Sequence, residues 1–386
     1  MSATALEQRA RRRLGEWDAA GLSRTLRPPS GVDLSSNDYL NLSRHPWIVG
    51  RMLEGVVREG CGSTGSRLLR GERECFDSVE TQFARFKGTE RALLFGAGYL
   101  ANIGVVTALA ERGDVICSDE RNHASLIDAA RLSRAETIVF PHNDVDALVR
   151  ALAGTAAAGV RFVLVESLFS MDGDFAPLRD YLSVCDSAGA ILIVDEAHAV
   201  GVYGHRGSGL IEEAGIDASR CLSINSGGKA LGVGGAFVAG AAWAIEYLIQ
   251  RARPFVFSTA PPPAIADALD ASLSLVQEEA ERRLRVRARA EYLREHLAAA
   301  GIMALPGTSQ IVPVVVGENT LATSVAASLQ ADGFDVRAIR PPSVPEGTAR
   351  LRLSVNAGLS TSTLDRVVDR LSAVLKEARA CSGACS

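Results

Sequence analysis

The chain has 386 residues, of which 47% are hydrophobic and 22% charged, and its formal net charge is −4. This length exceeds what one hydrophobic core usually serves, so we expect two domains, and the acidic balance argues against nucleic-acid binding. No apolar stretch follows the arginine-rich run Arg9–Arg13, no segment reaches membrane-spanning length, and seven scattered cysteines lack the spacing of zinc ligands, so the sequence predicts a cytoplasmic protein without a metal site.

Residues 1–45 are predicted to form an N-terminal segment that precedes the first large domain. A helix is expected over Thr4–Ala20, and the run Arg9–Arg13 fits its solvated face. An extended stretch from Val32 to Leu40 follows.

Residues 46–262 are predicted to form a large α/β domain. Short apolar runs alternate with amphipathic helical patterns, which is typical of βαβ units and a largely parallel sheet. The clearest strands are Arg161–Glu166, Ala190–Asp195 and Gly235–Gly240. Their continuous apolarity indicates burial on both faces of the sheet.

Residues 263–386 are predicted to form a smaller α+β domain. A proline-rich break at Ala260–Pro263 precedes one long charged helix from about Ala264 to Ala300. Strands are expected at residues 311–316, 335–339 and 349–354, and helices near 320–332 and 361–380.

Lysine is scarce in this chain, which has three lysines and 38 arginines. An amine can lose its proton and attack a carbonyl, whereas a guanidinium stays charged. Lys229 lies inside the glycine-rich segment Ser226–Gly235, so we interpret it as a reactive lysine. Lys87, before Gly88 at a predicted helix end, and Lys376, on a polar helix face, are interpreted as ordinary surface lysines.

Two predicted strands end in acids at the edge where open α/β sheets bind ligands, and the second of them runs directly into Asp195. A carboxylate that leaves a buried strand needs a cation, and the pyridinium nitrogen of a cofactor is one. His198, three residues later, could then bind the oxygen on the same ring. The alternative is a capping acid followed by a core histidine. Asp-Glu-Ala-His also occurs in helicases, but the phosphate-binding Gly-x-x-x-x-Gly-Lys-[Ser/Thr] is missing from the sequence.

A phosphate-binding turn is predicted at Phe95–Asn102, where glycines lead into a helix. Free amides near Gly98 and Tyr99 suit a phosphate, and the hydroxyl of Ser226 could join them. His123 could stack on a planar cofactor. A short glycine turn and a lone histidine are each more often structural. The order of the signals along one βαβ domain is specific, however: the glycine turn comes first, then His123, then Asp195 with His198, and then Ser226 with Lys229.

With these motifs in this order, the chain resembles the α-oxoamine synthases, which are fold-type I pyridoxal phosphate enzymes. The resemblance extends from Ser35 to Ser354, and its longest matching segments are Ser167–Asp174 and Asp195–Gly204. It implies an α/β fold with a mainly parallel seven-stranded sheet in the large domain and a smaller α+β C-terminal domain. Segments His142–Val145 and Ala338–Leu353 are most similar to the members that make 8-amino-7-oxononanoate in biotin biosynthesis. Those members condense L-alanine with a pimeloyl thioester, carried by coenzyme A or a carrier protein, and release carbon dioxide and the free thiol.

The resemblance also implies roles for individual residues. Lys229 would hold pyridoxal 5′-phosphate and move protons at the α-carbon of the amino acid, and His123 would stack over the ring as a second catalytic residue. The cofactor would be bound by Gly98, Tyr99, Ser170, Asp195, His198, Ser226 and Lys229. The substrates would be bound by Arg24, Asn37, His123, Ser343 and Arg352, the last of these on the amino-acid carboxylate.

A homodimer with a shared active site is implied as well, in which Ser258 and Thr259 would reach the phosphate of the partner subunit. Three other functions stay open at this point. The chain could be an α-oxoamine synthase that uses glycine or serine with another acyl thioester, an aminotransferase of the same fold, or a catalytically inactive binding protein.

Overall fold

The computed structural model describes residues 4–155 and 159–383, and its described residues divide into two compact units. The larger unit comprises Asn37–Ser170 and Asp174–Val286. The smaller unit comprises the described residues up to Ser36, the short segment Met171–Gly173, and the residues from Arg287 onward. In this division the larger unit includes residues 37–45, which the sequence analysis assigned to the N-terminal segment, and residues 263–286, which it assigned to the C-terminal domain.

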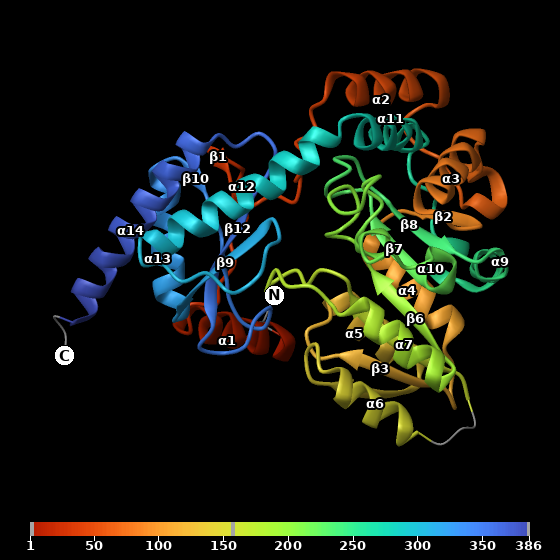
Figure 1. Ribbon diagram of the computed structural model, residues 1–386, viewed down its shortest axis with the longest axis horizontal. Helices are drawn as coiled ribbons and strands as arrows, with labels where there is room; N and C mark the ends of the chain where they lie inside the picture. The colour runs from red at the N-terminus through yellow and green to blue at the C-terminus, as the bar shows by residue number, and fades with distance from the viewer. Residues whose placement is uncertain (1–3, 156–158, 384–386) are drawn as a thin grey trace. The chain divides into compact units, whose positions relative to one another are not determined.

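The larger unit is built on a seven-stranded sheet in the order β2-β8-β7-β6-β5-β3-β4 (Figure 1). Only β8 runs antiparallel to its neighbours, so the predicted mainly parallel seven-stranded sheet is confirmed. The predicted strands at 161–166 and 190–195 match residue for residue, and the third begins one residue later than predicted. The strands are β2 (Arg91–Phe95), β3 (Val115–Asp119), β4 (Glu136–Phe140), β5 (Arg161–Glu166), β6 (Ala190–Asp195), β7 (Leu222–Ser226) and β8 (Ala236–Gly240).

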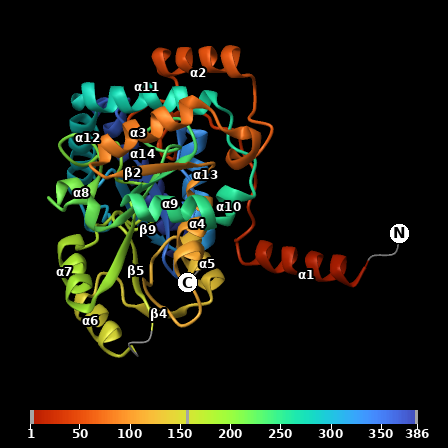
Figure 2. The ribbon, with the colours of Figure 1, turned by 90° about the vertical axis from the view of Figure 1, so that its right-hand side faces the viewer.

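Helices cover both faces of this sheet, which explains the continuous apolarity of its strands. Figure 2 shows α6 and α7 on one side of β5, and α4 and α5 on the other. One face is covered by α4 (Gly98–Leu109), α5 (Ala124–Ser133), α9 (Ala242–Arg251) and α10 (Arg253–Val256). The other face is covered by α6 (Val145–Ala153), α7 (Leu178–Ala188) and α8 (Leu210–Glu213).

Three further helices complete the larger unit, and two single turns lie at Arg67–Gly71 and Ala218–Arg220. The ring of Phe83 stacks on that of Phe237 in β8, with centroids 4.1 Å apart. This contact fixes one of the three helices against the sheet near its antiparallel strand. The helices are α2 (Pro46–Glu59), α3 (Glu74–Lys87) and α11 (Ala264–Glu278).

Lys87 is buried, so its interpretation as a surface lysine is wrong. The helix α3 does end at Gly88, in the left-handed conformation (φ +77°), as the sequence predicted. The Lys87 side chain, however, is only 1% exposed, pairs with the carboxylate of Glu196 and donates to the carbonyl of Ser208 at 2.6 Å. The glycine cap determines where a helix ends but not which face carries its last side chain.

The smaller unit contains a three-stranded antiparallel sheet in the order β11-β12-β9 and a two-stranded parallel sheet that joins β1 to β10. Its first helix begins after Thr4, whose hydroxyl accepts the amide hydrogen of Glu7 at 3.2 Å, so the predicted helix is confirmed. The elements are α1 (Ala5–Ala19), β1 (Val32–Asp33), β9 (Ile311–Gly317), α13 (Asn319–Ala331), β10 (Phe334–Asp335), β11 (Ala338–Ile339), β12 (Ala349–Ser354) and α14 (Thr361–Gly383).

Two predictions for the C-terminal half are wrong. The strand expected at residues 335–339 is two short strands, because β10 pairs with β1 whereas β11 pairs with β12, and the chain turns between them. The single helix expected at residues 264–300 is divided into α11 and α12 (Ala280–Ala299), because Glu279 leaves helical geometry (φ −102°, ψ 56°). The break separates the mostly buried, apolar α11 from the charged α12. None of the described helices is both long and apolar enough to cross a membrane.

Candidate active site

Asp195 lies at the carboxyl end of β6, at the edge where open parallel sheets bind ligands. It is buried, and each of its carboxylate oxygens accepts a hydrogen bond. The side-chain amide of Asn102 donates to Oδ2 at 2.7 Å, and the backbone amide of Ala197 donates to Oδ1 at 2.8 Å. These donors satisfy a buried carboxylate without neutralising it, so Asp195 can still meet a cation.

Asn102 is a site residue that the sequence analysis missed. It lies in α4 and is 2% exposed, and its amide also donates to the hydroxyl of Ser125 at 2.8 Å. That hydroxyl lies 2.7 Å from Nδ1 of His123. A chain of hydrogen bonds therefore joins two of the predicted site residues, Asp195 and His123. The signal in the sequence was an amide inside an otherwise apolar helix.

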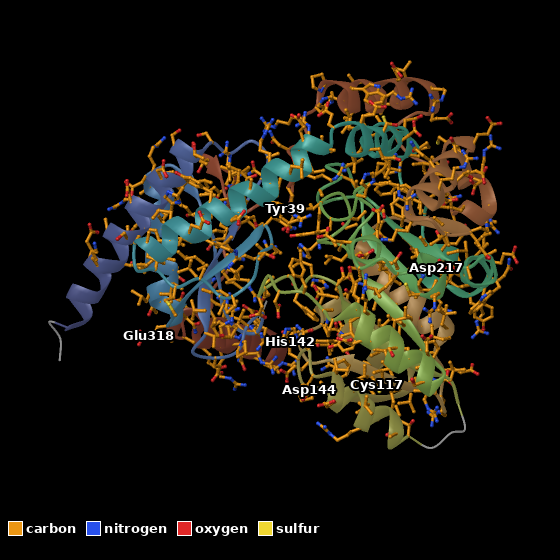
Figure 3. All side chains as sticks on the ribbon, in the orientation of Figure 1. Tyr39, Cys117, His142, Asp144, Asp217 and Glu318 are labelled. Carbon is orange, nitrogen blue, oxygen red and sulfur yellow. The ribbon has the colours of Figure 1, made fainter. Side chains whose placement is uncertain are left out.

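Lys229 and His198 are also brought together. The Nζ atom of Lys229 lies 2.9 Å from Nε2 of His198, and Nδ1 of the same ring lies 2.7 Å from the hydroxyl of Tyr39. This hydroxyl lies 3.1 Å from Oδ1 of Asn37, a predicted substrate residue. Tyr39, labelled in Figure 3, is fully buried and was not predicted as a site residue. Its place beside Asn37 in the predicted extended stretch was the signal.

Glu166 adds a second acid to the same edge. It ends β5 and pairs in register with Asp195 on the neighbouring parallel strand. Burial raises the pKa of Glu166, the charge of Asp195 raises it further, and Lys229 opposes the shift. Burial lowers the pKa of His123, with Lys229 acting in the same direction and Asp195 in the opposite one. The uncharged forms of Glu166 and His123 are therefore favoured.

The helix α4 presents its N-terminus beside these groups. Its N-cap residue, Ala97, makes no side-chain cap hydrogen bond, and its first turn carries no acid. A Cβ added at Gly98 would meet open space. Tyr99 is half-exposed, donates its hydroxyl to Asp128, and lies edge-on to His123 with centroids 6.3 Å apart. The free backbone amides at the start of α4 form an anion site next to the imidazole of His123.

Two serines flank the site. Ser226 ends β7 three residues before Lys229, is 8% exposed, and accepts the amide hydrogen of Gly228 at 3.3 Å. Ser170 is buried in the loop after β5 and donates its amide to Oε2 of Glu166 at 3.2 Å. Both serines therefore follow the carboxyl ends of central strands, on the same edge of the sheet as Asp195.

This set of groups fits pyridoxal phosphate. A buried carboxylate suits the pyridinium nitrogen, a lysine suits the aldehyde, and the open N-terminus of α4 suits the phosphate. Within the described parts of the chain, His, Cys, Asp and Glu side chains form no cluster of three or more that could hold a metal ion.

The remaining predicted substrate residues belong to the smaller unit. Arg24 and Ser343, predicted separately, line one cavity of about 130 Å³ together with Arg340. Arg24 also lines a second cavity of about 400 Å³. The guanidinium of Arg352 is buried and donates to the hydroxyl of Ser354 at 2.9 Å. Asn37, in contrast, belongs to the larger unit.

Known proteins resemble the chain over most of its length. The aminotransferase class I and II family matches residues 29–371. The 8-amino-7-oxononanoate synthase of Bordetella petrii is 45% identical over 349 residues, which cover 89% of this chain and 88% of that protein. The enzyme of the same name from Geobacter sulfurreducens is 44% identical over 372 residues, covering 92% and 95%.

Solved structures agree with this relationship. A serine palmitoyltransferase from S. paucimobilis, with a pyridoxal phosphate adduct bound, has a TM-score of 0.91 and 26% identity and covers 98% of this chain and 100% of that one. The 8-amino-7-oxononanoate synthase of Francisella tularensis has a TM-score of 0.79 and 28% identity, covering 90% and 98%. The chain belongs to the aminotransferase class I and II family and, within it, to the pyridoxal-phosphate-dependent α-oxoamine synthases.

Proposed function

We propose that this chain is an 8-amino-7-oxononanoate synthase, which condenses L-alanine with a pimeloyl thioester and releases carbon dioxide and the free thiol. The observation that carries the proposal is the approach of Lys229 to His198, at 2.9 Å, beside buried Asp195 in a chain 45% identical to an enzyme of that name. The short distance between a lysine amine and an ionisable imidazole supports the proposed role of Lys229 as the reactive lysine.

Pyridoxal phosphate, when bound, supplies an electron sink for the loss of a proton and of a carboxylate from the amino-acid carbon. Asp195 would hold the pyridinium nitrogen, with Asn102 and the amide of Ala197 fixing its carboxylate. Gly98, Tyr99 and Ser226 would hold the phosphate. The hydroxyl of Ser170 and the ring of His198 would contact the oxygen of the cofactor ring.

Lys229 would act as the proton carrier. Its neutral amine would take the proton from the α-carbon of alanine and return one to the product at the same carbon. His198, 2.9 Å away, is placed to exchange a proton with that amine, and its other nitrogen is held by Tyr39. His123 would cover the cofactor ring in its neutral form, which burial favours.

Substrate recognition would fall to arginines. The cavity of about 400 Å³ is lined by Arg24, Arg27, Arg337 and Arg340, and no acidic side chain is among its lining residues. Such a cavity favours an anionic substrate, and a pimeloyl thioester carries a terminal carboxylate. Arg352 offers a planar guanidinium to the carboxylate of alanine, as proposed from the sequence.

We also propose a homodimer. Several large apolar side chains on the larger unit are exposed, among them Leu53 (61%), Val57 (88%), Leu69 (84%) and Phe257 (71%). Exposed apolar groups in this number indicate a protein partner, and a second copy is the partner that the family implies. Phe257 adjoins Ser258 and Thr259, the residues expected to reach the phosphate of the partner subunit.

A cytoplasmic location completes the proposal. The described cysteines, Cys61, Cys75, Cys117, Cys185 and Cys221, are free thiols. Unpaired cysteines are typical of a reducing compartment.

Carbon dioxide release is the decisive assay. The purified protein with pyridoxal phosphate is supplied with L-alanine labelled in its carboxylate, together with pimeloyl-coenzyme A or the pimeloyl carrier protein. We expect labelled carbon dioxide only when both substrates are present, and none from Lys229→Ala. An aminotransferase would instead produce pyruvate without decarboxylation, and an inactive binding protein would release nothing.

The structural likeness to serine palmitoyltransferase supports a second candidate, because its TM-score of 0.91 exceeds the 0.79 of the 8-amino-7-oxononanoate synthase of Francisella tularensis. This candidate would use serine and a long acyl thioester. The same assay with labelled serine and glycine, and with acyl chains of increasing length, separates the two. Faster turnover with serine than with alanine would favour the second candidate.

A further inference from the structure

A second polar cluster, partly buried, lies beside the groups assigned to the cofactor, at the carboxyl ends of β3 and β4. It is centred on His142, two residues after β4 (Figure 3). Nδ1 of His142 lies 2.9 Å from Oδ1 of Asp119, the last residue of β3, and Nε2 lies 2.7 Å from Oδ2 of Asp174. The His142 side chain is 10% exposed and that of Asp119 is fully buried. One imidazole therefore bridges two carboxylates.

Asn143 reinforces the same contacts. It adopts a left-handed backbone conformation (φ +56°), and its amide hydrogen is donated to Oδ2 of Asp119 at 3.0 Å. Its side-chain amide donates to Oδ2 of Asp174 at 3.2 Å and to the carbonyl of Phe175 at 3.1 Å. His142 and Asn143, which follow β4, thus both form hydrogen bonds to the segment around Asp174.

Asp174 lies on the returning arm of a hairpin whose outgoing arm carries Ser170. The two arms are joined by a bridge between Leu168 and Phe175, and the amide of Phe169 donates to the carbonyl of Asp174 at 3.0 Å. The ring of His142 also meets that of Phe169 edge-on, with centroids 4.4 Å apart and an angle of 89°. His142 therefore contacts both arms of the hairpin, next to Ser170.

The charge of His142 follows from this geometry. A neutral imidazole offers one N–H and one lone pair, whereas two carboxylates require two N–H donors. Burial alone would lower the pKa of His142, but its hydrogen bonds to Asp119 and Asp174 raise it to about 9. The other titratable groups near these acids are Asp144, which caps α6, and Tyr181, whose own pKa is raised by burial and by the same carboxylates.

We propose that His142 is a positioning residue that, as an imidazolium bound to Asp119 and Asp174, fixes the Ser167–Ala176 hairpin and so holds Ser170 at the cofactor ring. The role of Ser170 rests on the proposed function, whereas the contacts of His142 do not. A neutral His142 would turn a lone pair toward one of the two carboxylates. The hairpin would then be held below about pH 9 and released above it.

The first test is direct titration of the imidazole by NMR. The chain has six histidines, so selective labelling gives few signals, and His142→Gln identifies the one that is lost. We expect His142 to titrate near 9, against an ordinary value of about 6.5. Asp174→Asn should lower this value by about one unit or more while the protein stays folded. Titration of His142 near 6.5 in the wild-type protein would overturn the proposal.

The second test measures the hairpin and the cofactor separately. In His142→Gln, hydrogen exchange of the 167–176 segment near pH 7 should be faster by about tenfold or more, with the other described segments unchanged. The visible absorption of bound pyridoxal phosphate should change near pH 9 in the wild-type enzyme and lose that transition in the variant. His296→Gln, whose ring stacks on Tyr292 in the smaller unit, is the matched control and should alter neither measurement.

The outcomes separate this inference from the proposed function. An unchanged exchange rate and an unchanged absorption profile in His142→Gln would show that His142 does not position Ser170. A wild-type protein that takes up no pyridoxal phosphate, while His142 still titrates near 9 and its loss still frees the hairpin, would instead refute the proposed function.

Discussion

The buried ion pair between Lys87 and Glu196 gives the sharpest prediction about stability. The two side chains are 1% and 0% exposed, and Glu196 also accepts the amide hydrogen of Ile211 at 3.0 Å. Lys87→Met keeps the length and the apolar stem of the side chain but removes its charge. Glu196 is then a buried carboxylate that has lost its cation.

The magnitude follows from that exposure. Removing one partner of a fully buried pair costs about 3–5 kcal/mol, because the remaining charge is left uncompensated, whereas removing both partners costs much less. A typical domain is stable by about 5–15 kcal/mol, so Lys87→Met should remove a large share of the free energy of unfolding. The double variant Lys87→Met with Glu196→Gln should recover about 2 kcal/mol or more of the loss.

Urea unfolding at fixed protein concentration, followed by circular dichroism, measures these differences. Lys376→Met is the matched control, because Lys376 is exposed on α14, and it should change stability by no more than about 0.5 kcal/mol. A loss below about 1 kcal/mol for Lys87→Met, or a double variant as unstable as the single one, would refute the argument that this pair is fully desolvated.

Four further outcomes are expected. Asn102→Ala should weaken pyridoxal phosphate binding by about tenfold or more in absorbance titrations, because it removes a donor to the active-site carboxylate; unchanged affinity would contradict this role. Gly201→Ala should lower the melting temperature by several degrees, roughly 1–3 kcal/mol, since φ is +86° and the new Cβ would lie 2.8 Å from that of Ala230; calorimetry that shows no shift would refute the strain. Arg24→Ala should raise KM for the acyl thioester about tenfold and leave KM for alanine unchanged in steady-state assays. The pKa of His142 is raised in the folded state, so the contribution of this residue to stability is complete below about pH 6.5 and is lost as pH rises through about 9. Urea midpoints compared across this range should show the loss in the wild-type protein and not in His142→Gln.

Much of the fold could be predicted because its signals are local. The strands at 161–166 and 190–195 are short apolar runs bounded by polar residues, and a parallel sheet covered on both faces accepts no other pattern. The start of α1 was predicted equally well, because Thr4 caps the helix through a hydrogen bond that needs no tertiary contact.

The errors arose where tertiary contacts decide the outcome. Val336 and Arg337 are ordinary strand residues by composition, yet the chain turns there because its two ends pair with different partners. Burial of Lys87 depends on Glu196, which is 109 residues away in the sequence. No local pattern reports a contact of that kind.

The same division applies to the candidate site. Lys229, Asp195 and His198 were predicted because each stands out beside glycines or at the end of a strand. Asn102 and Tyr39, which hold two of these side chains, lie in a helix and in an extended stretch whose patterns already explain them as structural residues. Residues that position another side chain are therefore harder to identify from local sequence patterns than residues that react.

The two acids at the ends of β5 and β6 show what the structure adds beyond position. Glu166 and Asp195 are neighbours in register, and two like charges so close together cannot both ionise cheaply. Asp195 accepts hydrogen bonds at 2.7 and 2.8 Å, whereas Glu166 accepts the amide hydrogen of Ser170 at a longer 3.2 Å. Burial and the neighbouring charge of Asp195 raise the pKa of Glu166 to about 8, which favours its uncharged form at neutral pH. The sequence presents the two acids as equivalent strand ends, whereas the shorter hydrogen bonds to Asp195 and the raised pKa of Glu166 distinguish them.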